Sequence, residues 1–300
     1  MTMTLPELRA FFGPHIRAAC PAAEGPRGAA APAGAAETLF VSLDGIRLWA
    51  AHNALPLRAA MVSLLGANVW PERFRRNFGL FSAAQMARLL HSRVLVLGCG
   101  GLGGHVAELL ARTGLGGLRL VDDDVFEESN LNRQRFCGER ALGLSKALTA
   151  REALRDMASH MDVEALQLRA DATSLPGLVA GMDLALDCLD DIATKTALEK
   201  AALAAGVPFI HGSVLRDEGF CYANAGPEAR LAQLYPEGQS PRQREQARRE
   251  GVSALAPAAV ACLMVRLALR ALLEHSADSP LFHLDLSVPE LEPFAWPDSA

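Results

Sequence analysis

The sequence predicts an α/β fold, a Rossmann-like open sheet whose N-terminal half is parallel and whose C-terminal half contains antiparallel strands. Short apolar runs alternate with helical segments from Ser92 onward, and a glycine-rich turn at 98–104 separates the first run from its helix. After Gly212 the pattern becomes strand-rich. Alternating strands and helices are typical of a mostly parallel sheet covered by helices on both faces.

A smaller N-terminal region of different composition precedes this domain. Residues 1–70 are expected to form a small helical appendage, and 71–300 the main domain. Within the appendage we predict a helix over 5–16, a linker over 18–36 and a strand followed by a helix over 38–65. The linker prediction depends on a segment dense in Ala, Pro and Gly. The purpose of residues 1–70 does not follow from their sequence.

The main domain opens with a βαβ unit. The apolar run 93–97 suits a buried parallel strand, a helix follows to about Arg112, and a second strand over 118–121 stops at three aspartates. The pattern then predicts helices over 146–157 and 195–205, strands over 163–168, 183–187 and 207–211, and an antiparallel strand over 219–223.

Composition and charge argue against several classes of function. A net charge of −5 and a pI near 5.9 give no electrostatic reason to expect general nucleic-acid binding. No apolar core of signal-peptide length begins the chain, and the apolar segment 254–273 carries Arg266 and Arg270, which favours a buried helix over a membrane span. The six cysteines form no Cys-x-x-Cys pair, as expected in a reducing cytoplasm.

The glycine-rich turn carries the pattern of a nucleotide site. Gly98, Gly100 and Gly103 fit G-x-G-x-x-G, in which the glycines permit a tight turn, close approach to phosphate and close packing of helix on strand. Asp122 ends the next strand, where a carboxylate can bind ribose hydroxyls. Nucleotide binding is therefore the interpretation that we favour over a purely structural turn.

Further polar residues favour a triphosphate over a dinucleotide. Arg133 and Lys146 can neutralise phosphate charge, and Asp190 can hold Mg²⁺ through oxygen. A nicotinamide site needs no such cluster. ATP with Mg²⁺ is thus the expected ligand.

These residues belong to a set of motifs that resembles the ThiF/MoeB/HesA family, bacterial relatives of ubiquitin-activating E1 enzymes. The similarity covers about residues 73–287. The motifs occur in the family's order: Arg73 to Arg76, the glycine loop, Asp122 with Asp124, Ser129 to Gln134, Gly143 to Lys146, and Leu186 to Asp190.

The resemblance implies ATP-dependent adenylation of the C-terminal glycine carboxylate of a small ubiquitin-like sulfur carrier ending in Gly-Gly, for thiamin or molybdopterin biosynthesis or a related sulfur pathway. It implies that Gly101 lies against the nucleotide, that Asp122 binds ribose and that Asp190 holds Mg²⁺. It further implies a homodimer in which Arg76 reaches into the partner's site. The resemblance assigns phosphate contacts to Asn130, Arg133 and Lys146. The expected catalytic residues are Arg76, Arg133, Lys146 and Asp190, and Ser129, Asn132 and Asp191 complete the candidate nucleotide ligands.

The sequence departs from the family at several positions. Two Cys-x-x-Cys pairs that hold zinc in many relatives are missing, so no zinc is predicted. Asp191 stands where Asn is common, and Asn77 where Gln is usual. The expected crossover loop, 226–251, lacks cysteine, so the reaction is expected to stop at the adenylate. Cys99 and Cys188 are expected to be buried small residues and not reactive thiols.

Three alternatives stay open. One is the branch of the family that activates a carboxylate on tRNA and closes a ring, and another is a NAD-dependent oxidoreductase. The third is a non-catalytic binding protein on the same fold. His211 and Arg216 flank Gly212 in the region where the resemblance places the carrier tail, and a structural role for His211 is at least equally favoured.

Overall fold

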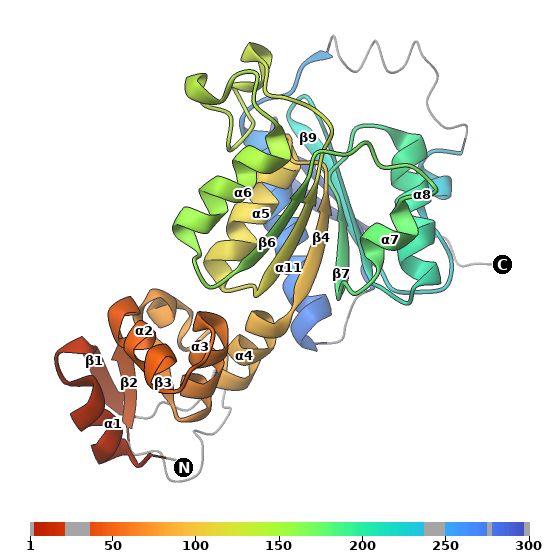
Figure 1. Cartoon of the computed structure of the whole chain (residues 1–300). Coiled ribbons are helices and arrows are strands. Elements are labelled where there is room, and N and C mark those ends of the chain that lie inside the picture. Colours follow the sequence, from red (N-terminus) through yellow and green to blue (C-terminus); the bar gives the residue numbers. More distant parts are fainter. Residues whose placement is uncertain (1–2, 22–36, 237–249, 275–277, 297–300) are drawn as a thin grey trace. The chain divides into compact units, whose positions relative to one another are not determined.

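The computed structural model describes residues 3–21, 37–236, 250–274 and 278–296 (Figure 1). Contacts group the chain into two compact units, Met1–His91 with Ser159–Met161, and Ser92–Ala158 with Asp162–Ala300. The chain thus divides after His91, some twenty residues beyond the expected boundary at 70.

The N-terminal unit contains a three-stranded sheet as well as helices, whereas only one strand, within 38–65, was expected there. Its three strands pair in the order β1-β2-β3. The elements, in order, are α1 (Leu5–Phe12), the 3-10 helix η1 (Gly13–His15), β1 (Ile16–Pro21), β2 (Glu37–Val41), α2 (Leu43–His52), α3 (Leu57–Gly66), β3 (Val69–Pro71), the 3-10 helix η3 (Glu72–Asn77) and α4 (Ala83–His91).

Two local predictions for this unit also need correction. Helix α1 ends at Phe12 and not at residue 16, because Gly13 takes a positive φ of 39° and Pro14 follows it. Residues 18–21, expected in the linker, belong to β1 and pair with β2. The remainder of the expected linker, 22–36, lies outside the described residues.

The larger unit is built on an eight-stranded sheet in the order β11-β10-β9-β8-β7-β4-β5-β6. The pairs from β8 to β6 in this order are parallel, and β8/β9, β9/β10 and β10/β11 are antiparallel. This confirms the predicted fold class. The strands are β4 (Arg93–Leu97), β5 (Gly117–Val121), β6 (Asp162–Leu166), β7 (Leu184–Asp187), β8 (Phe209–Leu215), β9 (Glu218–Asn224), β10 (Leu281–Asp285) and β11 (Glu290–Phe294).

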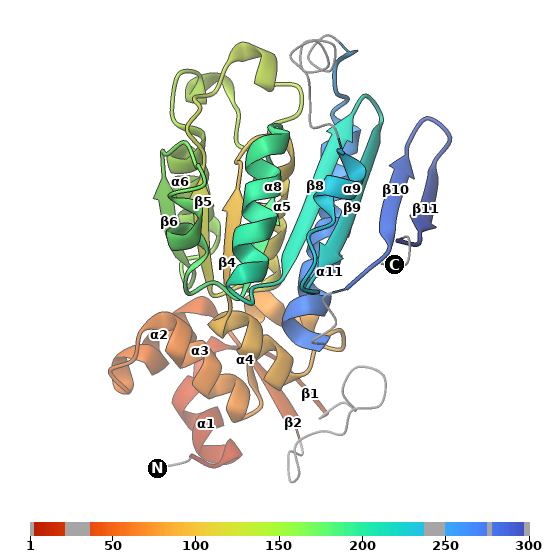
Figure 2. The ribbon, with the colours of Figure 1, turned by 90° about the vertical axis from the view of Figure 1, so that its right-hand side faces the viewer.

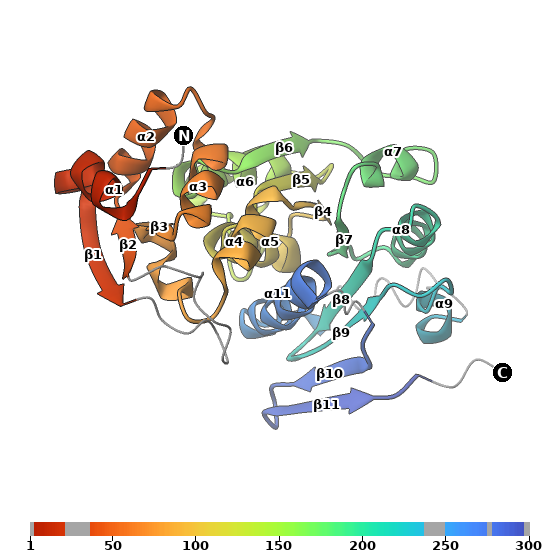
Figure 3. The ribbon, with the colours of Figure 1, turned by 90° about the horizontal axis from the view of Figure 1, so that it is seen from below.

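Helices cover both faces of this sheet (Figure 2 and Figure 3). One face carries α5 (Gly101–Thr113), α6 (Lys146–Met157) and α11 (Leu255–Glu274), and the other carries α7 (Leu175–Val179), α8 (Ile192–Ala204) and the short α9 (Leu231–Leu234). Helix α11 is long and apolar enough to cross a membrane, but it packs on α5, β8 and β9 with most of its apolar side chains buried. This agrees with the buried helix predicted there.

The topology brings the predicted site residues to one edge of the sheet. Strands β4, β5 and β7 are neighbours and parallel, and they end in register at Leu97, Val121 and Asp187. Ligands in open α/β sheets bind beyond this carboxyl edge. The glycine loop, the aspartates after β5 and those after β7 therefore leave the sheet side by side.

Candidate functional site

The glycine loop is built so that two of its glycines cannot be replaced without displacing backbone. A Cβ on Gly98, whose φ is +92°, would lie 2.6 Å from the carbonyl oxygen of Cys188. A Cβ on Gly103 would lie 1.7 Å from the carbonyl oxygen of Gly98. The loop can therefore turn tightly from β4 into α5, and the backbone amides at the start of α5 point beyond the sheet edge.

Gly100 and Gly101 of the loop face the segment that follows β5. The Cβ position of Gly100 lies 3.5 Å from the side-chain amide nitrogen of Gln134, and that of Gly101 lies 3.8 Å from Cγ of Arg133. Segment 129–134 thus folds back beside the N-terminus of α5. This places Arg133 next to the glycine loop, as the assignment of both to one nucleotide site requires.

Asp122 ties the end of β5 to the glycine loop. Its Oδ2 accepts a hydrogen bond of 2.6 Å from the backbone N–H of Cys99, and its Oδ1 accepts one of 2.9 Å from Asp124. Burial raises the pKa of Asp122, which these two backbone donors and Lys146 partly offset. The carboxylate is thus held at the glycine loop, and its expected contact with a ribose stays a prediction.

Lys146 begins α6 and points back to the same sheet edge. Ser145 caps the helix by accepting from the N–H of Leu148, and Nζ of Lys146 donates to Asp124 at 2.9 Å. The lysine side chain is only 9% exposed, whereas Asp124 is 66% exposed. An incoming anion could therefore replace or join Asp124 as the partner of this ammonium group.

The segment between β5 and α6 positions Arg133. Its NH1 donates to the carbonyl of Ser129 at 3.0 Å and to Oδ1 of Asn132 at 2.8 Å. The side chain of Asn130 is buried and bonds within the turn, accepting from Glu127 N and donating to Ser129 Oγ. In this structure Asn130 therefore orders the turn, and Asn132 also reaches the carbonyl of Val252 at 3.2 Å.

The two aspartates after β7 differ in what they bind. Asp191 is the N-cap of α8, and its Oδ2 accepts from the backbone N–H and the hydroxyl of Thr194 at 2.9 and 2.8 Å. Asp190 is exposed and has no hydrogen-bond partner among the residues that the structure describes. The Asp190 carboxylate is therefore available to a ligand, whereas the Asp191 carboxylate is already engaged in capping α8.

A second acidic group lies nearby. The carboxylates of Asp122, Asp123 and Asp124 have oxygens within 4.8 Å of one another. Asp122 and Asp124 already accept from backbone amides and from Lys146 respectively. The magnesium ligand expected at Asp190 is thus not part of this cluster.

Arg76 is the one predicted site residue outside the larger unit. It lies on η3 of the N-terminal unit, at a hollow of about 390 Å³. This hollow is lined by Ala18, Ala19, Phe40, Glu72, Arg75, Arg76 and Phe78. Arg76 thus belongs to a different unit from the other candidate residues, and its expected role in a partner's site stays a prediction.

A buried charged cluster at the end of β7 was not predicted. Asp187 is fully buried, receives Nζ of Lys195 at 3.1 Å and pairs with Nδ1 of His211 at 2.7 Å. Burial alone would raise the pKa of Asp187, but Lys195 and His211 outweigh it and hold this pKa below its usual range. Lys195 also donates to the carbonyl of Gly212 at 3.0 Å.

The cluster decides how His211 and the two cysteines are interpreted. His211 is fully buried, and burial together with Lys195 lowers its pKa, so its ring is neutral. This favours the structural alternative for His211. Burial likewise raises the pKa values of Cys99 and Cys188, in agreement with unreactive thiols at both positions. The only signal in the sequence was an aspartate that ends an apolar strand, Leu184–Asp187.

The fold and the site define a Rossmann-like nucleotide-binding domain with a glycine loop, an acidic strand end and basic side chains at one sheet edge. The model of the ThiF family matches residues 74–295, and the chain belongs to this family.

Individual relatives carry related names. The SAMP-activating enzyme E1 of Haloferax volcanii is 35% identical over 189 residues, which is 62% of this chain and 69% of that protein. The molybdopterin-synthase adenylyltransferase of Escherichia coli K12 is 37% identical over 154 residues, 50% of this chain and 62% of that protein. The mouse adenylyltransferase and sulfurtransferase MOCS3 is 43% identical over 132 residues, 44% of this chain but only 29% of that protein.

Solved structures share the fold at lower sequence identity. Escherichia coli MccB in complex with MccA-N7isoASN superposes with a TM-score of 0.63 at 21% identity, covering 76% of this chain and 74% of that one. PaaA superposes with a TM-score of 0.61 at 20% identity, covering 74% and 81%. At these identities the likeness shows the fold alone.

Proposed function

We propose that this protein uses ATP to adenylate the C-terminal glycine carboxylate of a small ubiquitin-like sulfur carrier. The observation that carries the proposal is the meeting of the glycine loop, Arg133 and Lys146 at one sheet edge, with the unengaged Asp190 after the neighbouring strand. The names of the relatives from H. volcanii and E. coli support the same reaction class. Thiamin, molybdopterin or a related sulfur pathway would supply the carrier.

The reaction needs charge stabilisation more than covalent help. A carboxylate oxygen of the carrier attacks the α-phosphorus of ATP. The bond between the α-phosphorus and the oxygen that bridges it to the β-phosphorus breaks, and pyrophosphate leaves with the electron pair of that bond. The amides at the start of α5 and the guanidinium of Arg133 would stabilise charge on the phosphoryl oxygens. Lys146 would exchange Asp124 for a phosphate oxygen, and Asp122 would orient the ribose.

The residues present also fit a magnesium ion. Asp190 is an exposed carboxylate with no partner in the described part of the chain, which suits a hard cation that prefers oxygen ligands. Mg²⁺ bound with ATP would neutralise charge on the phosphates as pyrophosphate departs. Asp191 keeps the start of α8 in place behind that ligand.

A homodimer in the cytoplasm is part of the proposal. The segment between β5 and α6 exposes four large apolar side chains within twenty residues, Val125, Leu131, Leu142 and Leu144. Apolar surface gathered in this way favours burial against another chain. A second copy on this segment would lie beside the nucleotide site, where a partner's Arg76 could contribute.

ATP–pyrophosphate exchange tests the proposal directly. Purified protein, Mg²⁺ and a panel of small carriers ending in Gly-Gly should give exchange that depends on one carrier and is lost when its final glycine is removed. Exchange without any carrier would show a different acceptor. Measurable ATP binding with no exchange for any carrier would contradict the proposal and favour a tRNA carboxylate substrate or a binding role.

A further inference from the structure

Gln134 carries a buried side-chain amide whose hydrogen-bonding capacity the rest of the protein does not meet. The residue is 8% exposed, and its Oε1 is buried with no hydrogen-bond partner among the residues that the structure describes. A buried acceptor without a partner lowers stability, so native proteins contain few of them. The unpartnered oxygen of Gln134 therefore requires a physical reason.

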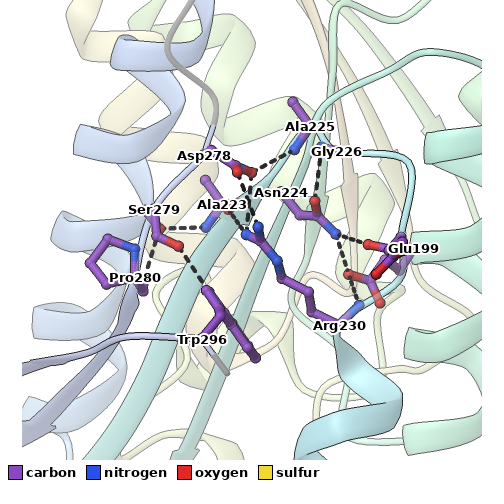
Figure 4. Close-up of polar contacts among 11 residues, drawn as sticks. Glu199, Ala223, Asn224, Ala225, Gly226, Arg230, Asp278, Ser279, Pro280 and Trp296 are labelled. Atoms are coloured by element: carbon purple, nitrogen blue, oxygen red, sulfur yellow. Dashed lines mark hydrogen bonds and ion pairs between the residues drawn. The ribbon is translucent and has the colours of Figure 1, made fainter. Parts of the chain in front are cut away.

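The other buried amide side chains in the described part of the chain do form hydrogen bonds. These are Asn68, Asn130 and Asn224. Asn224 is fully buried, and its Nδ2 donates to Oε1 of Glu199 at 2.9 Å (Figure 4). Its Oδ1 accepts from a backbone N–H at 3.0 Å. Both ends of this amide are thus engaged, in contrast to Gln134.

The amide of Gln134 lies against the second glycine of the G-x-G-x-x-G pattern, Gly100. The three atoms nearest to the Cβ position of Gly100 are Nε2, Cδ and Oε1 of Gln134, at 3.5, 3.7 and 3.8 Å. The space that a side chain at residue 100 would fill is therefore open and lined by this amide. The second glycine of the pattern is the one that lets backbone approach phosphate. A phosphate oxygen close to Gly100 would come within reach of Nε2.

The start of α5 supplies further donors beside the same space. The first hydrogen bond of the helix runs from Gly104 N to Gly100 O at 3.1 Å, so the N–H groups of residues 101–103 have no acceptor within the helix. These groups and the helix dipole favour an anion. The amide of Gln134 would present Nε2 to that anion, because its oxygen would be repelled there. Oε1 then points away from the ligand, which explains why it has no partner.

We propose that Gln134 binds a phosphate group of the nucleotide through Nε2, and that its unpartnered Oε1 is the consequence of holding this donor at the glycine loop. This rests on the proposed use of ATP at the site. An apolar side chain of similar length would leave no acceptor unpartnered, but it would offer no donor to the phosphate. Gln134 therefore lowers the stability of the free protein and raises its affinity for nucleotide. A purely structural amide would not have these opposite effects.

The test compares Gln134→Met and Gln134→Glu with Asn224→Ala as the matched control. Methionine keeps the length of the side chain and removes its polar atoms, whereas glutamate keeps the shape and replaces the donor by an acceptor. Asn224 is also a buried amide, but it pairs with Phe209 at the start of β8, away from the carboxyl edge of the sheet. Urea unfolding and the affinities for ATP and for adenosine are measured on each full-length protein without carrier.

Gln134→Met should unfold at a urea concentration no lower than that of wild type, because it removes an unpartnered buried acceptor. Its affinity for ATP should fall by about tenfold or more, as expected for a lost hydrogen bond to a charged group, while its affinity for adenosine stays within about twofold. Gln134→Glu should weaken ATP binding further, since a carboxylate would face the phosphates. Asn224→Ala should show the opposite pattern, a lower urea midpoint with ATP affinity within about twofold of wild type.

Unchanged ATP affinity in Gln134→Met would overturn the proposal. Wild-type ATP affinity in Gln134→Glu would also overturn it, because the residue would then act as an acceptor. Equal losses of affinity for ATP and adenosine, or a loss of stability in Gln134→Met as large as in Asn224→Ala, would mark the amide as structural. If wild-type protein binds ATP but adenylates no carrier, only the proposed function fails, because ATP affinity still decides the role of Gln134.

Discussion

Two lysine–aspartate pairs occupy similar places in the larger unit and differ in their surroundings. Lys146 is the first residue of α6 and pairs with Asp124, three residues beyond β5, whereas Lys195 is the fourth residue of α8 and pairs with Asp187, the last residue of β7. Asp124 is 66% exposed and Asp187 is fully buried. The first pair therefore faces the sheet edge, and the second lies beneath a helix.

The comparison shows which electrostatic interactions are available to a ligand. Lys146 shares its charge with a solvated carboxylate, so a phosphate can compete for it at little cost. Lys195 and Asp187 are buried away from water and bind each other, with Gly212 as a further partner of Lys195 and His211 as a further partner of Asp187. Separating the pair would leave a buried charge without its counter-charge. The same residue types thus serve binding in one place and folding in the other.

The largest effect should come from breaking the buried pair. Lys195→Met keeps the length of the side chain but leaves the Asp187 carboxylate uncompensated, so we expect the free energy of unfolding to fall by about 3–5 kcal/mol. Urea denaturation of wild-type and variant protein measures this change. The loss of stability should come from the broken ion pair and not from a change in helix propensity, since Lys and Met are similar helix formers.

Lys146→Met supplies the matched control at the sheet edge. Its stability should change by no more than about 1 kcal/mol, because the pair includes an exposed aspartate. Pyrophosphate exchange should nevertheless fall sharply. Equal destabilisation by both variants would mean that the two pairs do not differ as their exposure indicates.

The next largest effect concerns the two aspartates that precede α8. Asp190→Ala should reduce pyrophosphate exchange by on the order of a hundredfold or more, since it removes the candidate metal ligand, with little change in stability. Asp191→Asn is the control, because Asn also caps helices well. If Asp191→Asn proves as inactive as Asp190→Ala at unchanged stability, the carboxylate of Asp191 also takes part in the metal site.

A smaller effect should appear as pH falls. Burial and Lys195 lower the pKa of His211 in the folded protein below the usual 6.5. The unfolded chain therefore binds a proton first, and stability is lost as pH falls below about 6.5, by at most about 1.4 kcal/mol per pH unit for this one group. Urea unfolding at pH values between about 7.5 and about 5.5, one unit on either side of 6.5, measures the slope of the free energy of unfolding against pH.

Two substitutions isolate this contribution. His211→Gln should flatten the slope relative to wild type, because the buried group no longer titrates. His91→Gln, at an exposed histidine of α4, should leave the slope unchanged. A slope that is the same in all three proteins would show that His211 titrates alike in the folded and unfolded chain.

The parallel sheet and the glycine loop could be predicted because their signals are local. The apolar run before Gly98, the glycine spacing and the aspartate that ends the next strand each depend on neighbours in sequence. The N-terminal sheet was missed for the opposite reason. Its strands β1 and β2 are separated by 15 residues, 22–36, and β3 joins them after two helices, so the pairing is not visible in either segment alone.

The same distinction between local and long-range signals applies to the candidate site. Gly98, Asp122 and Lys146 were predicted from motifs, and the structure brings them to one edge. The contacts of Asp187, and of the buried Glu199 that accepts from Tyr222, Asn224, Arg230 and Leu231, depend on partners from other strands and helices. No spacing rule reveals such buried carboxylates. Asp191 illustrates the limit, since its N-cap role depends on where α8 begins, three residues before the predicted start.

The smallest effect should follow metal removal. Structural zinc sites take four ligands that are commonly supplied by Cys-x-x-Cys pairs, but the sequence has no such pair, and Cys221 is a single buried cysteine on β9. We therefore expect substoichiometric zinc by elemental analysis. A chelator should shift the melting temperature by less than about 1 °C, because domains that depend on structural zinc unfold when it is withdrawn and this one would have none to lose. Stoichiometric zinc, or a large chelator-induced shift reversed by zinc alone, would contradict the prediction.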